Sequence, residues 1–116
     1  MSKLHLFRDT KGCFERSDPA PDRSISGEPY GETLNMFESN DGKIFSGIWR
    51  ASKGAWHVAY DETEYCYITK GRARLIENGG ATREVQIGDG FVIEAGFHGI
   101  WDVIDDMEKH YMIVIE

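Results

Sequence analysis

A glutamate and a tyrosine on neighbouring β-prone runs have the side chains best suited to acid–base chemistry. Tyr60 ends the run 56–60, and Glu64 begins the run 64–69. Strand alternation gives each of them a defined face. If both faces line one cavity, Glu64 and Tyr60 are the candidate catalytic residues, as acid and base. The alternative is structural, with Glu64 only accepting a hydrogen bond from Tyr60.

Large aromatic residues recur around this pair and could form the walls of a binding pocket. The candidate binding residues are Trp49, Trp56, Tyr60, Glu64, Trp101 and Tyr111. Stacking and cation–π contacts with such a set suit a small planar or cationic organic molecule. The alternative is a filled core, since three tryptophans can occupy the interior of a narrow barrel.

The segments that carry these residues predict an all-β architecture. Turn signals such as Asn78-Gly79-Gly80 separate short β-prone runs from about residue 33 onward. No window shows a sustained helical period. The predicted strands are 33–38, 44–50, 56–60, 64–69, 72–77, 82–87, 91–94, 100–104 and 110–115, with Lys70-Gly71 ending the fourth. This spacing is typical of an antiparallel sandwich or barrel.

Length and composition indicate one domain preceded by an arm. A chain of 116 residues can bury one modest core. All three prolines lie in the first 32 residues, which show no sustained period. We therefore expect an arm with little regular structure over 1–32 and a barrel over 33–116. The arm is expected to pack over a barrel end or over a partner subunit.

Charge and hydropathy argue against several classes of partner. The chain has 13 Lys and Arg against 20 Asp and Glu, so its net charge is −7. That balance disfavours nucleic acid and anionic membrane surfaces. No apolar run reaches the roughly 18 residues of a membrane span, and the N-terminus lacks a signal-peptide core, so the expected location is cytoplasmic. Cys13 and Cys66 are expected to be free thiols.

Two segments resemble the paired signature motifs of the cupin superfamily. The first runs from Glu64 to Gly71, and the second begins with Gly88-Asp89 and ends at Gly96. With the Gly-x-Trp at 99–101 and the Lys-x-Tyr at 109–111, residues 33–116 resemble the small single-domain cupins of domain of unknown function 861, or cupin type 3. That group includes relatives of the ureidoglycine aminohydrolase and ethanolamine-utilisation cupins. The resemblance implies a single antiparallel cupin (RmlC-like) jelly-roll barrel, and a homodimer.

The resemblance also implies where a metal would bind, and this sequence departs from the pattern there. Metal-binding cupins supply three histidines and one glutamate, and the corresponding positions here hold Val58, Tyr60, Gly99 and Glu64. Only the glutamate is a good metal ligand, so we expect neither a metal nor a cofactor. The alternative is a displaced site of His57, Glu64 and His98. A shift of one residue along a strand, however, turns the side chain to the opposite face.

In the cupin fold that the sequence resembles, the strand faces that carry the candidate residues line the interior of the barrel. The predicted function is therefore metal-free binding of a small organic molecule, an amine or another nitrogen-containing compound, in the lumen. Two alternatives stay open. One is a hydrolase or isomerase related to ureidoglycine aminohydrolase that uses Glu64 and Tyr60. The other is a filled barrel that acts as a structural or partner-binding module.

Overall fold

Strands dominate the computed structural model, which describes residues 2–116. They are β1 (Glu15–Arg16), β2 (Ser24–Ser26), β3 (Gly31–Glu38), β4 (Ile44–Ala51), β5 (Gly54–Ala59), β6 (Thr63–Glu77), β7 (Thr82–Gln86), β8 (Gly90–Ile93) and β9 (His98–Val114). Two single 3-10 turns, η1 (Phe7–Asp9) and η2 (Pro21–Arg23), are the only helical segments in this part of the chain. Neither is long and apolar enough to cross a membrane. The predicted all-β class is confirmed.

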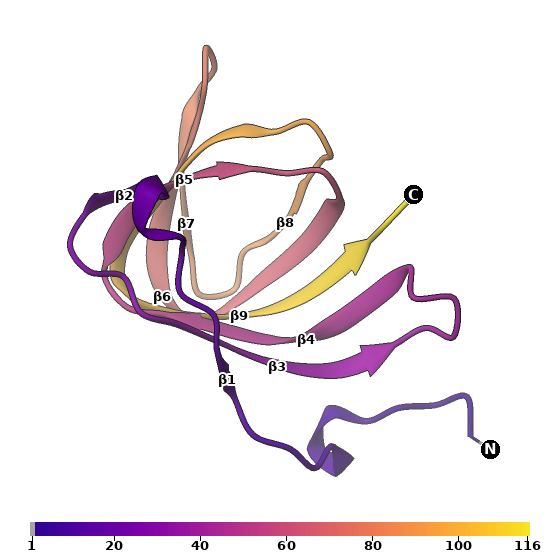
Figure 1. Cartoon of the computed structure of the whole chain (residues 1–116). Coiled ribbons are helices and arrows are strands. Elements are labelled where there is room, and N and C mark those ends of the chain that lie inside the picture. The colour runs from indigo at the N-terminus through magenta and orange to yellow at the C-terminus, as the bar shows by residue number, and fades with distance from the viewer. Residues whose placement is uncertain (1) are drawn as a thin grey trace.

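Two long strands, β6 and β9, pair along their whole length, and each belongs to two sheets. The first half of β6 pairs with β8 and the second half with β7. The first half of β9 pairs with β5 and the second half with β4. The first sheet therefore runs β1-β3-β4-β9-β6-β8 and the second β2-β5-β9-β6-β7, with every pair antiparallel. Figure 1 shows the two sheets curving around a common interior, which is the predicted jelly-roll architecture.

A bend between the sheets explains why two pairs of predicted strands are single strands. The predicted runs 64–69 and 72–77 form β6, and 100–104 and 110–115 form most of β9. The β6–β9 register shifts in the middle of the ladder. Gly71 lies at that point with a φ of +78°, and a Cβ there would collide with the backbone oxygen of Asp106. The Lys70-Gly71 signal thus marks a bend in a continuous strand and does not end it.

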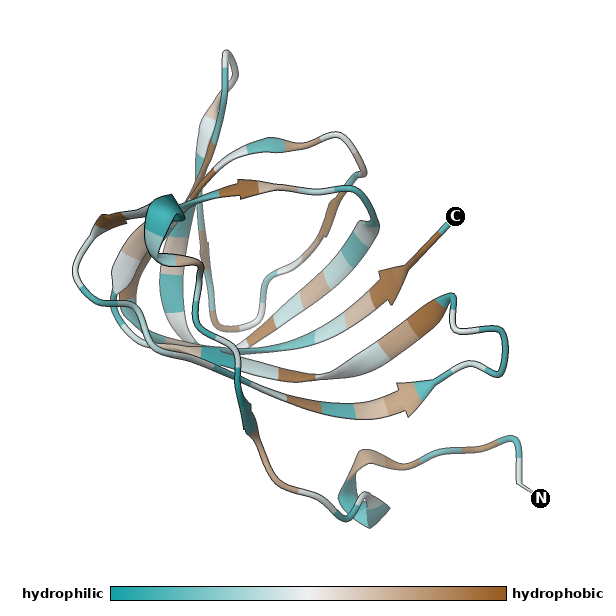
Figure 2. Cartoon of the chain, viewed as in Figure 1, coloured by the Kyte–Doolittle hydropathy of each residue, from teal (hydrophilic) through white to brown (hydrophobic). Residues whose placement is uncertain are grey.

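Alternate side chains of the strands fill the space between the sheets. Figure 2 shows apolar and polar residues alternating along the strands. On β6, Cys66 and Ile68 before the bend and Ala73 and Leu75 after it are buried. Trp101, Val103 and Met107 of β9 are buried on the same side. Removing these apolar surfaces from water is the main source of stability, and it fixes which residues face the interior.

The N-terminal arm is mostly irregular and exposed, and it lies against its own barrel. Its short strands β1 and β2 pair with β3 and β5, respectively. The ring of Phe7 lies 5.4 Å from that of His110, and the ring of His5 lies 5.0 Å from that of Phe37. In Figure 1 the first part of the arm lies below β3, and the later part rises past β3 to β2, beside β5. The domain boundary at residue 32 stays a prediction, with β3 beginning at Gly31.

Candidate functional site

A cavity of about 290 Å³ lies between the two sheets, and all six predicted binding residues line it. The lining consists of Thr33, Trp49, Trp56, Val58, Tyr60, Glu64, Trp101, Lys109, Tyr111 and Ile113. Strands β3 and β4 with the second half of β9 form one wall. Strand β5 with the first half of β9 forms the other. The volume is near the lower limit for small-molecule pockets. We refer to this space as the lumen cavity.

Three tryptophans form a continuous aromatic wall across the lumen cavity. Trp56 and Trp101 lie opposite each other in the β5–β9 pair. The ring of Trp49, from the other sheet, lies 6.0 Å from each of theirs, in tilted contacts. Trp56 and Trp101 are also buried core residues, so these side chains both fill the interior and line the space that is left.

A buried lysine that the sequence prediction did not include is at the centre of the site. The Nζ of Lys109 donates a hydrogen bond to Oε2 of Glu64 over 3.2 Å and lies 3.6 Å from Sγ of Cys66. It also lies 4.6 Å and 4.7 Å from the ring centres of Trp49 and Trp101. Lys109 is 4% exposed and Glu64 5% exposed. The hydrogen bond from Tyr60 to Glu64, which the structural alternative assumed, is not formed; Lys109 is the hydrogen-bond donor to Glu64 instead.

The ion pair determines the protonation of its surroundings. Burial has the largest single influence and would lower the pKa of Lys109, but Glu64, Cys66 and Tyr60 together outweigh it, and the net shift is upward. The lysine therefore stays charged at neutral pH. Burial raises the pKa of the Cys66 thiol to about 12, although the ammonium beside it acts in the opposite direction. Cys66 is therefore a neutral, unreactive thiol.

The two tyrosine hydroxyls of the lumen cavity have different roles. Trp101 donates a hydrogen bond from Nε1 to the Tyr60 hydroxyl oxygen over 3.0 Å, which leaves the Tyr60 O–H to donate elsewhere. Tyr111 donates its own O–H to Oδ1 of Asn35 over 2.8 Å, so it presents mainly its ring. Burial raises the pKa of both phenols, that of Tyr111 to about 12. Neither is a base near neutral pH.

The residues at the cupin metal position do not fit a metal ion. Val58 and Gly99 offer no ligand atom, and the Lys109 ammonium is already paired with Glu64 and would repel a second cation. The alternative set is not assembled either, because His57 and His98 are exposed while Glu64 is buried. Within residues 2–116, no three histidine, cysteine or acidic side chains are grouped to hold a metal.

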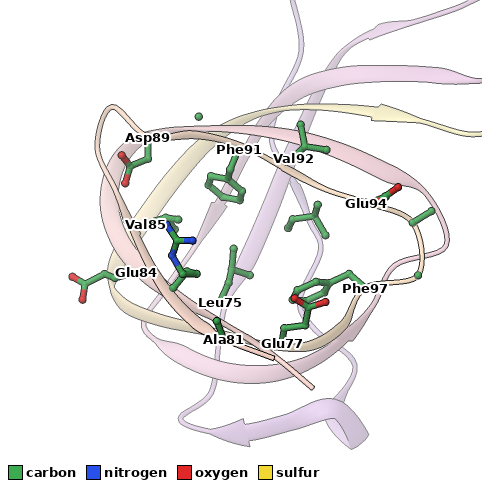
Figure 3. Close-up of a pocket in the computed structure, with 15 residues that line it drawn as sticks. Leu75, Glu77, Ala81, Glu84, Val85, Asp89, Phe91, Val92, Glu94 and Phe97 are labelled. Carbon is green, nitrogen blue, oxygen red and sulfur yellow. The ribbon is translucent and has the colours of Figure 1, made fainter. Parts of the chain in front are cut away.

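A second cavity, of about 830 Å³, lies between the unpaired edges of β7 and β8. Figure 3 shows Leu75 and Phe91 pointing into it and Glu84 pointing away. Two aromatic contacts separate it from the lumen cavity, Phe91 with Trp101 and Phe97 with Tyr60, with ring centres 6.3 Å and 6.0 Å apart. The buried ion pair does not line this larger space, so we place the candidate site in the lumen cavity.

Two antiparallel sheets that share their long strands and enclose a lumen form a jelly-roll barrel, the architecture that the cupin motifs imply. The chain belongs to the EutQ-like cupin domain family, which matches residues 38–111. The resemblance seen in the sequence motifs is thereby confirmed. No curated protein sequence matches the chain.

Solved structures of similar fold include proteins of the same group. A DUF861-family protein of unknown function from Pseudomonas syringae has a TM-score of 0.81 and 22% identity, covering 89% of this chain and 45% of its own. This chain thus spans less than half of that protein. The EutQ protein of Clostridium difficile has a TM-score of 0.67 and 13% identity, covering 88% of this chain and 94% of its own. A DUF861-family protein from Thermotoga maritima has a TM-score of 0.54 and 28% identity, covering 55% of this chain and 73% of its own.

The signal that would have identified Lys109 is present in the sequence. Tyr111 is expected to point inward, and a residue two positions away on a strand shares its face. Lys109 therefore has the same orientation as Tyr111, and both are buried. A lysine is rarely buried unless it is paired, which is why the sequence alone favours placing it at the surface.

Proposed function

We propose that the lumen cavity binds a small, uncharged, nitrogen-containing organic molecule, without a metal ion. One observation carries the proposal. A carboxylate acceptor, Glu64, lies beside the Lys109 ammonium donor at one aromatic-walled cavity, which the Tyr60 hydroxyl also lines. Adjacent donors and acceptors complement an amide-like group, in which N–H and C=O are neighbours. The aromatic walls suit a planar body.

The buried lysine changes the expected charge of the ligand. The sequence suggested that the ring faces of Trp49 and Trp101 could bind an organic cation. In the structure, the Lys109 ammonium already lies over both rings. A second cation at these faces would be repelled at short range in a poorly solvated space. A neutral nitrogen compound fits better than a protonated amine.

The same contacts support binding over catalysis by Glu64 and Tyr60. The raised pKa of Tyr60 keeps its hydroxyl protonated, so it can donate a hydrogen bond but cannot accept a proton as a base. Glu64 accepts a hydrogen bond from Lys109, and in the part of the chain that the structure describes it forms none with Tyr60. A hydrolase or isomerase of this type would instead show turnover that Glu64→Gln abolishes. A fully filled barrel would leave no space of the size observed.

A matched set of three probes tests the charge preference. Benzamide, benzamidine and benzoate have the same ring and nearly the same size, but they are neutral, cationic and anionic. We expect quenching of tryptophan fluorescence by benzamide at concentrations at least tenfold lower than by the two ions. Val58→Phe, which fills the lumen cavity, should remove the response, while Ile87→Phe at an exposed position should keep it. Tighter binding of benzamidine, or a response that Val58→Phe leaves intact, contradicts the proposal.

Elemental analysis tests the metal-free part of the proposal separately. Protein prepared without a histidine tag should contain no stoichiometric transition metal, because a cation would have to displace Lys109 from Glu64. One equivalent of zinc, iron, manganese or nickel that disappears in Glu64→Gln would show that a metal occupies the lumen.

A further inference from the structure

The second cavity has an apolar floor to which both sheets contribute. Leu75 and Val85 of the second sheet and Ile93 of the first are buried, and Phe91 and Phe97 are half-buried. All five side chains line the cavity. Its volume of about 830 Å³ is within the range of small-molecule pockets. The floor therefore suits the apolar part of a ligand.

An arginine projects from the inner face of β7 at this cavity. Arg83 lies directly opposite Leu75 in the β6–β7 pair and two residues before Val85 on its own strand. Alternate residues of a strand share a face, and both of these neighbours are buried, so the Arg83 side chain is on the cavity side. It is exposed there because the cavity opens to solvent between the edges of β7 and β8.

Arg83 has no ionic partner in the part of the chain that the structure describes. The other arginines of residues 33–116 are Arg50, Arg72 and Arg74, and each contacts at least one carboxylate within 3.7 Å. A guanidinium presents a planar fork of N–H donors that matches the two oxygens of a carboxylate. Arg83 is thus available for an anionic group of a ligand in the cavity.

Glu77 places a carboxylate on the same inner face, close to Arg83. It follows Leu75 by two residues on β6, and it lines the cavity. Its backbone N–H donates to the carbonyl of Ala81, so Glu77 is the diagonal neighbour of Arg83 across the hairpin. Diagonal neighbours have Cβ atoms roughly 7–8 Å apart, which long side chains can span through a small ligand. Within residues 2–116, neither side chain is in an ion pair.

The other three carboxylates around the cavity differ in what they contact. Glu84 is already paired with an arginine and points away from the cavity in Figure 3. Asp89 accepts a hydrogen bond from a backbone N–H of its own turn. Glu94 follows the end of β8, and its backbone carbonyl accepts a hydrogen bond from the N–H of Phe97. Glu94 and Glu77 are therefore the carboxylates available to a cationic group.

We propose that the second cavity binds a zwitterion with an apolar body, namely an α-amino acid with a large apolar side chain. Arg83 donates to the ligand carboxylate, Glu77 accepts from the ligand ammonium, and the rings of Phe91 and Phe97 pack against the side chain. An anion alone would leave the two free carboxylates unpaired and be repelled by them. A cation alone would leave the guanidinium unpaired, so a ligand with both charges complements the cavity best.

This site is independent of the function proposed for the lumen cavity. The contacts of Phe91 with Trp101 and of Phe97 with Tyr60 separate the two spaces. The lumen cavity has its own charges paired with each other, whereas the second cavity has unpaired charges of both signs. The two cavities therefore differ in the ligands they favour, and each can be tested while the other is blocked.

Three probes with the same phenyl group test the charge requirement. Phenylalanine has both charges, 3-phenylpropionate has only the negative one, and phenethylamine has only the positive one. In NMR titrations of the ¹⁵N-labelled full chain, we expect phenylalanine to bind at least about fivefold more tightly than either of the others. The shifted amides should lie in 82–86 and 90–97, and Val58→Phe, which fills the lumen cavity, should leave those shifts unchanged.

Two variants assign the charges, with a third as the control. Arg83→Met should weaken the binding of phenylalanine and of 3-phenylpropionate at least about fivefold, but not that of phenethylamine. Glu77→Gln/Glu94→Gln should weaken phenylalanine and phenethylamine instead. Arg74→Met is the matched control, because Arg74 is an exposed arginine of the same hairpin that pairs on the outer face, and it should change none of the three affinities.

The dispersion of the same NMR spectra shows whether each variant is folded. Phenylalanine that binds no more tightly than the two single-charge probes overturns the proposal. Folded Arg83→Met with the wild-type affinity for phenylalanine overturns it as well, because the carboxylate would then be bound elsewhere. Shifts that Val58→Phe abolishes would place the ligand in the lumen cavity and also contradict the assignment.

Discussion

The Lys109 ammonium lies beside Glu64, the one residue of the cupin metal pattern that this chain retains. It neutralises Glu64, covers two tryptophan faces and lies next to a neutral thiol. Burying both charges is costly unless they satisfy each other, and at 3.2 Å they do. The pair thereby makes the lumen electrically neutral while keeping strong hydrogen-bonding groups at its wall.

Breaking the pair from either side should destabilise the fold strongly. Lys109→Met leaves Glu64 as a buried carboxylate without its partner, and Glu64→Gln leaves a buried ammonium. Each should reduce the free energy of unfolding by about 3–5 kcal/mol in urea titrations. The double variant Lys109→Met/Glu64→Leu should lose clearly less than the sum of the single losses, because no buried charge is left.

Lys70→Met is the control for loss of a lysine from the same ladder. Lys70 is exposed and lies opposite Glu108 in the β6–β9 pair. Its replacement should change the free energy of unfolding by no more than about 0.5 kcal/mol. Additive losses in the double variant would show that Lys109 and Glu64 are not coupled.

Two bent strands, β6 and β9, determine the shape of the barrel. Each passes from one sheet into the other, so the lumen is enclosed without a separate corner element. The bend brings the two backbones into close contact at Gly71, where a side chain has no room. Glu64 and Lys109 lie on the same side of this bend, in the first sheet, and Trp101 lies beyond it in the second.

A pair of glycine substitutions separates backbone strain from close approach. Gly71 and Gly79 have similar φ values, +78° and +71°, but a Cβ at Gly79 would have no atom within 4 Å. Gly79→Ala should therefore lower the free energy of unfolding by only about 1–2 kcal/mol, the energy of placing an alanine in the left-handed conformation. Gly71→Ala should cost at least about 3 kcal/mol, because β6 must also move away from β9. Equal losses in chemical denaturation would show that the bend has room for a side chain.

At the scale of the whole molecule, the lumen keeps four groups protonated that the unfolded chain would release in alkali. The pKa is raised in the folded state for Lys109, Cys66, Tyr60 and Tyr111. Unfolded cysteine, tyrosine and lysine titrate near 8.5, 10 and 10.4. A group with a raised folded pKa contributes stability below its unfolded pKa and loses that contribution as pH rises through the folded pKa.

The protein should therefore lose stability as pH rises from about 8.5 toward 12. The expected slope is about 1.4 kcal/mol per pH unit for each group that is titrating only in the unfolded state. Cys66→Ala should delay the onset to about pH 10, since the thiol, with its folded pKa of about 12, is the first of the four to contribute. Urea midpoints between pH 7 and 11 measure both effects. A flat profile would mean that these groups are accessible to solvent in the folded protein.

The sequence by itself determined the fold class, the motifs and the inward orientation of the six predicted binding residues. Period-two alternation and glycine-rich turns are local properties, and they specify strands and faces wherever one face is buried. All six predicted binding residues line one cavity for that reason. The absence of histidines at positions 58, 60 and 99 is likewise read directly from the sequence.

Only the tertiary structure decided how the inward-facing groups pair and whether space is left between them. Alternation orients Lys109 inward, but its contact with Glu64 spans 45 residues and depends on the β6–β9 register, which includes bulges at the bend. Continuity of β6 through Gly71 depends on the approach of Asp106, which is also distant in sequence. The volume of the lumen depends on how three tryptophans from both sheets pack together. Such quantities arise from contacts between distant segments, and a local pattern does not contain them.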